Sequence, residues 1–228
     1  MSARLVEIEV SDPRMLRSPA TELSAARAAA EADPEVWAVL VRATGADPPA
    51  APAGVESAVS SATPWAKPLV LAVDGVVSGA GLGLAACADA IVATPEASFL
   101  LPSADGAGAD PEVLLRCCAQ LPYRLVTALT MARRPLSAER AHEVGFVTEL
   151  ADADELEGTA RLWAESFAAV PPGAAGGIRQ AALEGLGLGL AEAIAGRYEA
   201  VGRYAGSADA AEAVRALLEG RRPLWHGH

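Results

Sequence analysis

The chain has 228 residues, a formal net charge of −11 at pH 7 and 52% hydrophobic residues. This length suits one folding unit with a single sizeable core. The acidic balance disfavours the phosphate backbone of a nucleic acid as a partner, although a few local arginines would suffice for the phosphates of a small ligand.

The cysteines and the first residues of the chain indicate the cellular compartment of the protein. Cys87, Cys117 and Cys118 are an odd number of cysteines without metal-ligand spacing. Charged residues stand near the start, where a signal peptide needs an apolar run, and the longest uncharged apolar stretch, between Asp74 and Asp89, is too short to cross a bilayer. The sequence therefore predicts a cytoplasmic protein with no membrane segment and no metal site.

Hydrophobic periodicity predicts an α/β fold. In chain order, the expected strands are residues 3–10, 36–45, 67–75 and 90–94. The expected helices are residues 20–32, 111–121, 124–132 and 137–143, the last capped by Ser137. Residues 76–89 are expected to form a glycine-rich turn that opens into a helix. Residues 152–219 predict three more helices, separated at 171–177 and 202–207. We expect a core over residues 1–150 and a helical region over 151–228, both within one folding unit.

Three segments resemble the enoyl-CoA hydratase/isomerase family, the crotonases. Residues 67–99, KPLVLAVDGVVSGAGLGLAACADAIVATPEASF, resemble its signature stretch. Residues 129–150 resemble its S-A-E-x-A, then G-x-V segment, and the ending DAAEAVRALLEGRRPLWHG resembles its last helix and tail. The resemblance implies a spiral of ββα units followed by a C-terminal helical region that forms trimers or hexamers.

The family holds a thioester carbonyl between two backbone N–H groups, which stabilise the enolate oxygen of the transition state. By position, one donor is the N–H of Ala80, between Gly79 and Gly81. The second is the N–H of Ala53, beside Gly54. The alternative for the glycine-rich turn is a helix-packing role alone.

The hydratases of the family use two glutamates as acid and base. The resemblance places Gly83 and Ser103 at those two positions. Neither residue carries a carboxylate, so hydration by the usual machinery is not expected.

Some family members carry an aspartate further on, near the start of the next helix. Asp110 falls at or within one residue of that position and is the expected catalytic carboxylate; Glu112 is a weaker candidate, and Asp105 weaker still. Asp110 before Pro111 also suits a helix cap, and a residue can serve as both cap and catalyst.

These residues imply an enzyme acting on acyl-CoA or an acyl carrier thioester, with isomerase or related α-carbon chemistry favoured over hydration. No tightly bound cofactor is expected, because CoA is part of the substrate. The alternative is a catalytically silent crotonase that assists a partner enzyme in polyketide or aromatic acyl-CoA biosynthesis. A third possibility is a subunit of a mixed oligomer.

Overall fold

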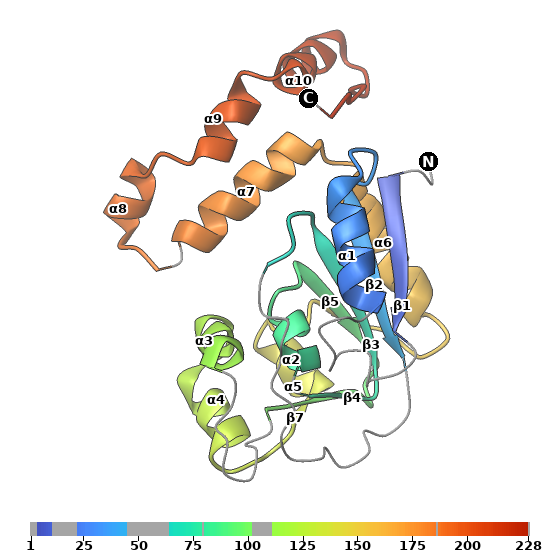
Figure 1. Ribbon diagram of the computed structural model, residues 1–228, viewed down its shortest axis with the longest axis vertical. Coiled ribbons are helices and arrows are strands. Elements are labelled where there is room, and N and C mark those ends of the chain that lie inside the picture. Colours follow the sequence, from blue (N-terminus) through green and yellow to red (C-terminus); the bar gives the residue numbers. More distant parts are fainter. Residues whose placement is uncertain are drawn as a thin grey trace.

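The computed structural model describes residues 4–10, 22–44, 64–78, 80–101, 111–185 and 187–227. Its larger sheet has five parallel strands in the order β1-β2-β3-β5-β8 (Figure 1). These strands are β1 Leu5–Val10, β2 Ala38–Thr44, β3 Leu69–Asp74, β5 Ala90–Ala93 and β8 Glu149–Leu150. A smaller sheet, in the order β4-β6-β7, contains β4 Val76–Ser78, β6 Ser98–Leu100 and β7 Leu136–Ser137. The prediction of an α/β fold is confirmed.

The central strands are buried on both faces, as their continuous apolar runs predict. Val39 and Val41 of β2 belong to the main core, whereas Leu40 between them packs with the opposite face. Helix α6, Leu156–Ala168, covers that opposite face with Ala160 and Ala164, both fully buried. Alternation of side chains along a strand therefore gives the sheet two apolar layers.

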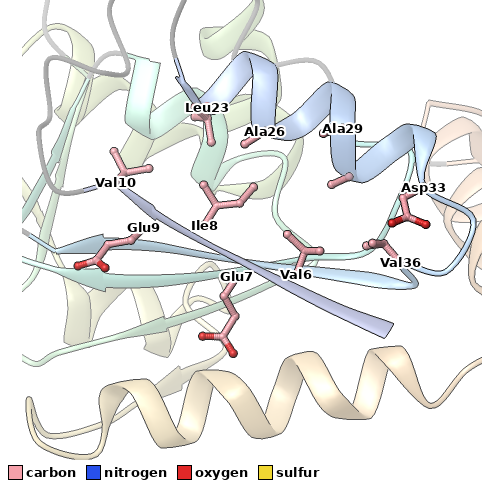
Figure 2. Close-up of a pocket in the computed structure, with 11 residues that line it drawn as sticks. Val6, Glu7, Ile8, Glu9, Val10, Leu23, Ala26, Ala29, Asp33 and Val36 are labelled. Carbon is pink, nitrogen blue, oxygen red and sulfur yellow. The ribbon is translucent and has the colours of Figure 1, made fainter. Parts of the chain in front are cut away.

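Strand β1 lies at the edge of the larger sheet and is half-buried. Its Glu7 pairs with Arg161 of α6 at 2.8 Å, and its Glu9 lies 3.4 Å from Arg42. Helix α1, Glu22–Ala32, runs along the other face of the strand (Figure 2). The alternation of charged and apolar residues in β1 thus separates an ion-paired face from an apolar face.

The turn from β3 into β4 is fixed by polar contacts. Gly75 has a φ of 91°, a conformation that glycine adopts without strain. The hydroxyl of Thr94, fully buried, donates to the Asp74 carboxylate at 3.0 Å. Asp89 accepts the Leu69 N–H at 2.8 Å, which joins the segment after the turn to the start of β3.

Three helices follow the smaller sheet. They are α3 Pro111–Gln120, α4 Tyr123–Thr130 and α5 Ala138–Glu143. Ser137 caps α5 by accepting the Arg140 N–H at 3.2 Å. The three helices and the cap that the sequence predicts here are confirmed.

The C-terminal region differs from the prediction. Over the described part of residues 152–219 there are five helices, and not three: α6, α7 Pro172–Gly185, α8 Leu190–Ala195, α9 Glu199–Ala205 and α10 Ala208–Glu219. The expected breaks at 171–177 and 202–207 are wrong, since α7 runs through the first and α9 covers part of the second. The first error has a physical cause, because Pro172 suits the first position of a helix.

Packing explains why α7 tolerates its glycines. A Cβ atom on Gly177 would lie 3.3 Å from the Val201 Cα atom of α9, and one on Gly173 would lie 3.1 Å from the Tyr204 ring. The glycines therefore let two helices approach closely, which outweighs their low helix propensity.

We expect replacement of Gly177 by leucine to lower the free energy of unfolding by about 1–3 kcal/mol, because the new side chain meets the α9 backbone. Gly176 provides the matched control, since a Cβ there meets nothing within 4 Å. Gly176→Ala should raise stability by up to about 1 kcal/mol through helix propensity alone. Urea unfolding of both variants checks the pair, and equal effects of the two substitutions would contradict the packing.

Helices α7 to α10 extend beyond the sheet, whereas α6 lies on it (Figure 1). Arg179 ties α7 to the core by donating to Asp89 at 2.8 Å and to the Trp65 carbonyl at 2.7 Å. At the far end, Arg4 stacks 3.5 Å from the Trp37 ring centroid and donates to the Trp225 carbonyl at 3.1 Å. The division of the chain at residue 150 remains a prediction.

Two buried carboxylates of α10 hold the C-terminal tail. Asp209 accepts the backbone N–H groups of His226 and Gly227 at 2.7 and 2.8 Å. Glu212 accepts two hydrogen bonds from Arg221, at 2.5 and 3.0 Å, and one from the Leu224 N–H. The tail is thereby folded back along its own helix.

The hydrogen bonds from Arg221 lower the pKa of Glu212 from 4.5 to about 2. A carboxyl group whose folded pKa is depressed adds stability above its unfolded pKa and loses it as the pH falls toward the folded value. The melting-temperature difference between the wild type and Glu212→Gln should therefore be full above pH 5 and shrink between about pH 4.5 and 2. The exposed Glu192→Gln serves as the control, and a pH-independent difference for Glu212→Gln would refute the linkage.

No helix in the described ranges is both long and apolar enough to traverse a lipid bilayer.

Candidate functional site

The carboxyl ends of the parallel strands meet at one edge of the larger sheet. In the strand register Val10 of β1 pairs with Ala43 of β2, and Thr44 pairs with Asp74 of β3. Ligands of open α/β sheets bind outside this edge, because the connecting loops converge there. One of the two turns that the sequence predicts to hold a thioester, at Ala80, comes after β3 and the short strand β4 of the smaller sheet.

Helix α2, Ala80–Ala85, follows strand β4 with one residue between them. Ala80 is its first residue, and backbone N–H groups in the first turn of a helix have no partner within the helix. The partial positive charge of the helix end also favours developing negative charge on a ligand oxygen. The position of Ala80 therefore suits the expected oxyanion donor.

Gly81 and Gly83 are buried within α2. Gly83 stands where the resemblance places the first glutamate of the hydratases, and it carries no side chain that could move a proton. The other expected site residues lie outside the described ones: Ala53, Gly54, Gly79, Ser103 and Asp110.

Glu112 is the second residue of α3, which packs against α2. Its side chain is 45% exposed and lies 3.9 Å from the Arg116 guanidinium one turn later. An exposed carboxylate beside an arginine in a first helical turn is typical of a structural residue. Helix α3 begins at Pro111, as the predicted cap at Asp110 requires.

The buried thiols near α2 are poor nucleophiles. Burial raises the pKa of Cys87 at the end of α2 to about 11, although nearby Arg116 partly opposes the shift. Burial also raises the pKa of Cys117 on α3 to about 11. Both thiols are protonated at neutral pH, so neither is a reactive nucleophile.

His142 is exposed, and its Nδ1 atom lies 3.1 Å from the Val147 carbonyl oxygen. In the described part of the chain, no three His, Cys, Asp or Glu side chains group as a metal site requires.

A cavity of about 480 Å³ lies between β1 and α1. Figure 2 shows Val6, Ile8 and Val10 directed toward α1, with Glu7 and Glu9 directed away. The helix presents Leu23 and small alanines to the strand, which do not fill the space. No wall of this cavity comes from α2 or α3, so it is separate from the turn at Ala80. No sequence pattern predicts this cavity.

Comparison with known proteins agrees with the resemblance. The model of the family described as enoyl-CoA hydratase/isomerase matches residues 50–228. Carnitinyl-CoA dehydratase from Proteus mirabilis is 31% identical over 166 residues, which cover 71% of this chain and 64% of that protein. The chain thus spans less than two thirds of the curated relatives that it matches.

Solved structures cover the whole chain. An enoyl-CoA hydratase/isomerase from Mycobacterium paratuberculosis is 30% identical with a TM-score of 0.83, and the match covers 100% of this chain and 97% of that one. An enoyl-CoA hydratase from Mycobacterium tuberculosis is 26% identical with a TM-score of 0.84 and the same coverage. Fold, motifs and family match agree, and the chain therefore belongs to the enoyl-CoA hydratase/isomerase family, the crotonases.

Proposed function

We propose that this protein binds an acyl thioester, either acyl-CoA or an acyl carrier thioester, and stabilises its enolate with the backbone N–H groups of Ala80 and Ala53. The observation that carries the proposal is the position of Ala80 as the first residue of α2, at the end of the signature strand and turn. A donor fixed by the fold needs no reorganisation when charge develops on the carbonyl oxygen.

Double-bond isomerisation, or another reaction at the α-carbon, suits the available groups better than hydration. The named relatives are hydratases and a dehydratase. The resemblance, however, places Gly83 and Ser103 of this chain where hydratases of the family carry their two glutamates. A reaction that moves a proton needs one carboxylate, which Asp110 supplies at the start of α3. No tightly bound cofactor is needed, because the CoA group belongs to the substrate.

Exchange of the α-protons of butyryl-CoA in deuterated water tests the proposal directly. Enolate formation replaces these protons with deuterium, which NMR or mass spectrometry detects without knowledge of the natural acyl group. We expect exchange well above the rate in buffer, with crotonyl-CoA hydration far below that of a hydratase. Hydration at an ordinary hydratase rate would refute the argument from Gly83 and Ser103.

The second candidate function is a catalytically silent homologue that assists a partner enzyme in acyl-thioester biosynthesis. The substitution of both glutamate positions favours it. Binding of butyryl-CoA without any α-proton exchange would select this function over the enzyme.

We also propose that the chain assembles as a homotrimer or hexamer through its C-terminal helices. Large apolar side chains are exposed there, among them Leu190 at 78%, Ile194 at 75%, Leu217 at 80% and Leu218 at 82%. Large exposed apolar side chains are typical of subunit interfaces. Sedimentation equilibrium should give a trimer or a multiple of it, and a monomer would contradict this assembly.

A further inference from the structure

Most arginines of this acidic chain are engaged with carboxylates. The arginines whose guanidinium groups lie within ion-pair distance of Asp or Glu are Arg27, Arg42, Arg116, Arg140, Arg161, Arg179, Arg203, Arg215 and Arg221. Arg124 and Arg134 are exposed and pair with no described carboxylate. No Asp or Glu occurs between Glu112 and Glu139. The region around α4 is therefore locally basic in a chain of net charge −11.

The outward face of α4 adds apolar contact area to this charge. Val126 and Leu129 are buried on the inner face, whereas Tyr123 is 76% exposed. Met131, directly after the helix, is 82% exposed and lies seven residues from Arg124, on the same face after two turns. Tyrosine, methionine and arginine are the residues enriched in protein–protein interfaces.

Arg133 has a backbone conformation that is unfavourable for arginine. Its φ is 51°, and the next residue donates its N–H to the Ala128 carbonyl, as at a helix end where glycine is usual. The chain therefore turns at Arg133, between the end of α4 and Arg134.

We propose that Tyr123, Arg124, Met131 and Arg134 form a docking surface, the α4 surface, for an acidic carrier protein that delivers the thioester. This proposal rests on the proposed function. Helix α4 contacts α3, which contacts α2, so the surface lies close to the Ala80 turn (Figure 1). A thioester on the flexible arm of a docked carrier would approach the site from this side.

The exposed apolar side chains favour a protein over the phosphates of free CoA. Arg124 lies in the first turn of α4, whereas Arg134 follows the helix and donates its N–H to the Ala128 carbonyl. Tyr123 and Met131 are exposed in the same region, and a phosphate group alone offers nothing for such side chains to pack against. Charges spread around exposed apolar side chains instead match an extended acidic surface.

The test uses the full-length protein and the acidic acyl carrier protein of bacterial fatty-acid synthesis, as apo-protein and as butyryl thioester. Binding is measured by isothermal titration calorimetry at low and high salt, beside butyryl-CoA. We expect Arg124→Glu with Arg134→Glu to weaken carrier binding at least 10-fold and to leave butyryl-CoA affinity within 2-fold. The matched control is Arg197→Glu with Arg222→Glu, which changes the net charge equally on other exposed arginines.

The outcomes separate this inference from the proposed function. Carrier binding lost in the first double variant alone supports the α4 surface, even if butyryl-CoA fails to bind and the thioester function falls. Absence of carrier binding to the wild type, or equal losses in both double variants, overturns it. Equal loss of butyryl-CoA affinity assigns the arginines to CoA phosphates, and a changed oligomeric state assigns the surface to a second copy; both results also overturn it.

Discussion

Replacement of Ala80 by proline is expected to lower α-proton exchange about 100-fold or more, the usual effect of losing one oxyanion donor. Proline has no N–H, so the substitution removes the proposed donor and nothing else that the helix needs. Ala80 is the first residue of α2, where proline is tolerated because that N–H makes no intrahelical bond. Thermal unfolding should therefore change little while the rate of exchange collapses.

Ala80→Gly is the matched control for this experiment. It keeps the N–H and only removes a methyl group, so exchange should stay near the wild-type rate. Retention of exchange in the proline variant would show that the α2 amide is not the donor, and the glycine-rich turn would then have a packing role alone.

Replacement of Asp110 by asparagine should reduce exchange by about 100-fold or more, the usual contribution of a general acid or base. Asparagine is as good a helix cap as aspartate, so the variant preserves any capping of α3 at Pro111. The substitution therefore separates the two roles that the sequence assigns to Asp110. Initial rates across pH, with melting temperatures of both proteins, provide the measurement.

Glu112→Gln is the control two residues away. Its side chain is 45% exposed beside Arg116, and we expect its exchange rate to remain within about 2-fold of the wild type. A large loss in this variant, with full activity in Asp110→Asn, would transfer the catalytic role to Glu112.

The elements predicted from sequence are those with long, uniform patterns. The apolar runs over β2 and β3 and the cap at Ser137 each carry a local physical signal, and the structure confirms them. Strands β4, β6, β7 and β8 are not predicted, because each has two or three residues, too few to show a period. In the sequence, the glycines of α7 look like a helix break. Their role is to let α7 approach α9 closely, which no local pattern reveals.

The candidate site was predictable only in part. The family motif predicts Ala80 as a backbone donor, and its position as the first residue of α2 agrees with that role. The α4 surface was not predictable, because Arg124 and Arg134 stand out only after the partners of the other arginines are known. Ion pairs such as Arg161 with Glu7 join residues far apart in sequence, and no local pattern announces them.

The three cysteines offer a practical consequence. Cys87 and Cys117 are buried, and both have pKa values near 11, whereas Cys118 of α3 is exposed. The thiolate is the form of cysteine that attacks a maleimide, so a maleimide fluorophore should label Cys118 selectively in the native protein. Helix α3 contacts both α2 and α4. The fluorescence of such a dye would therefore report binding of a ligand or partner at either helix, without an engineered cysteine.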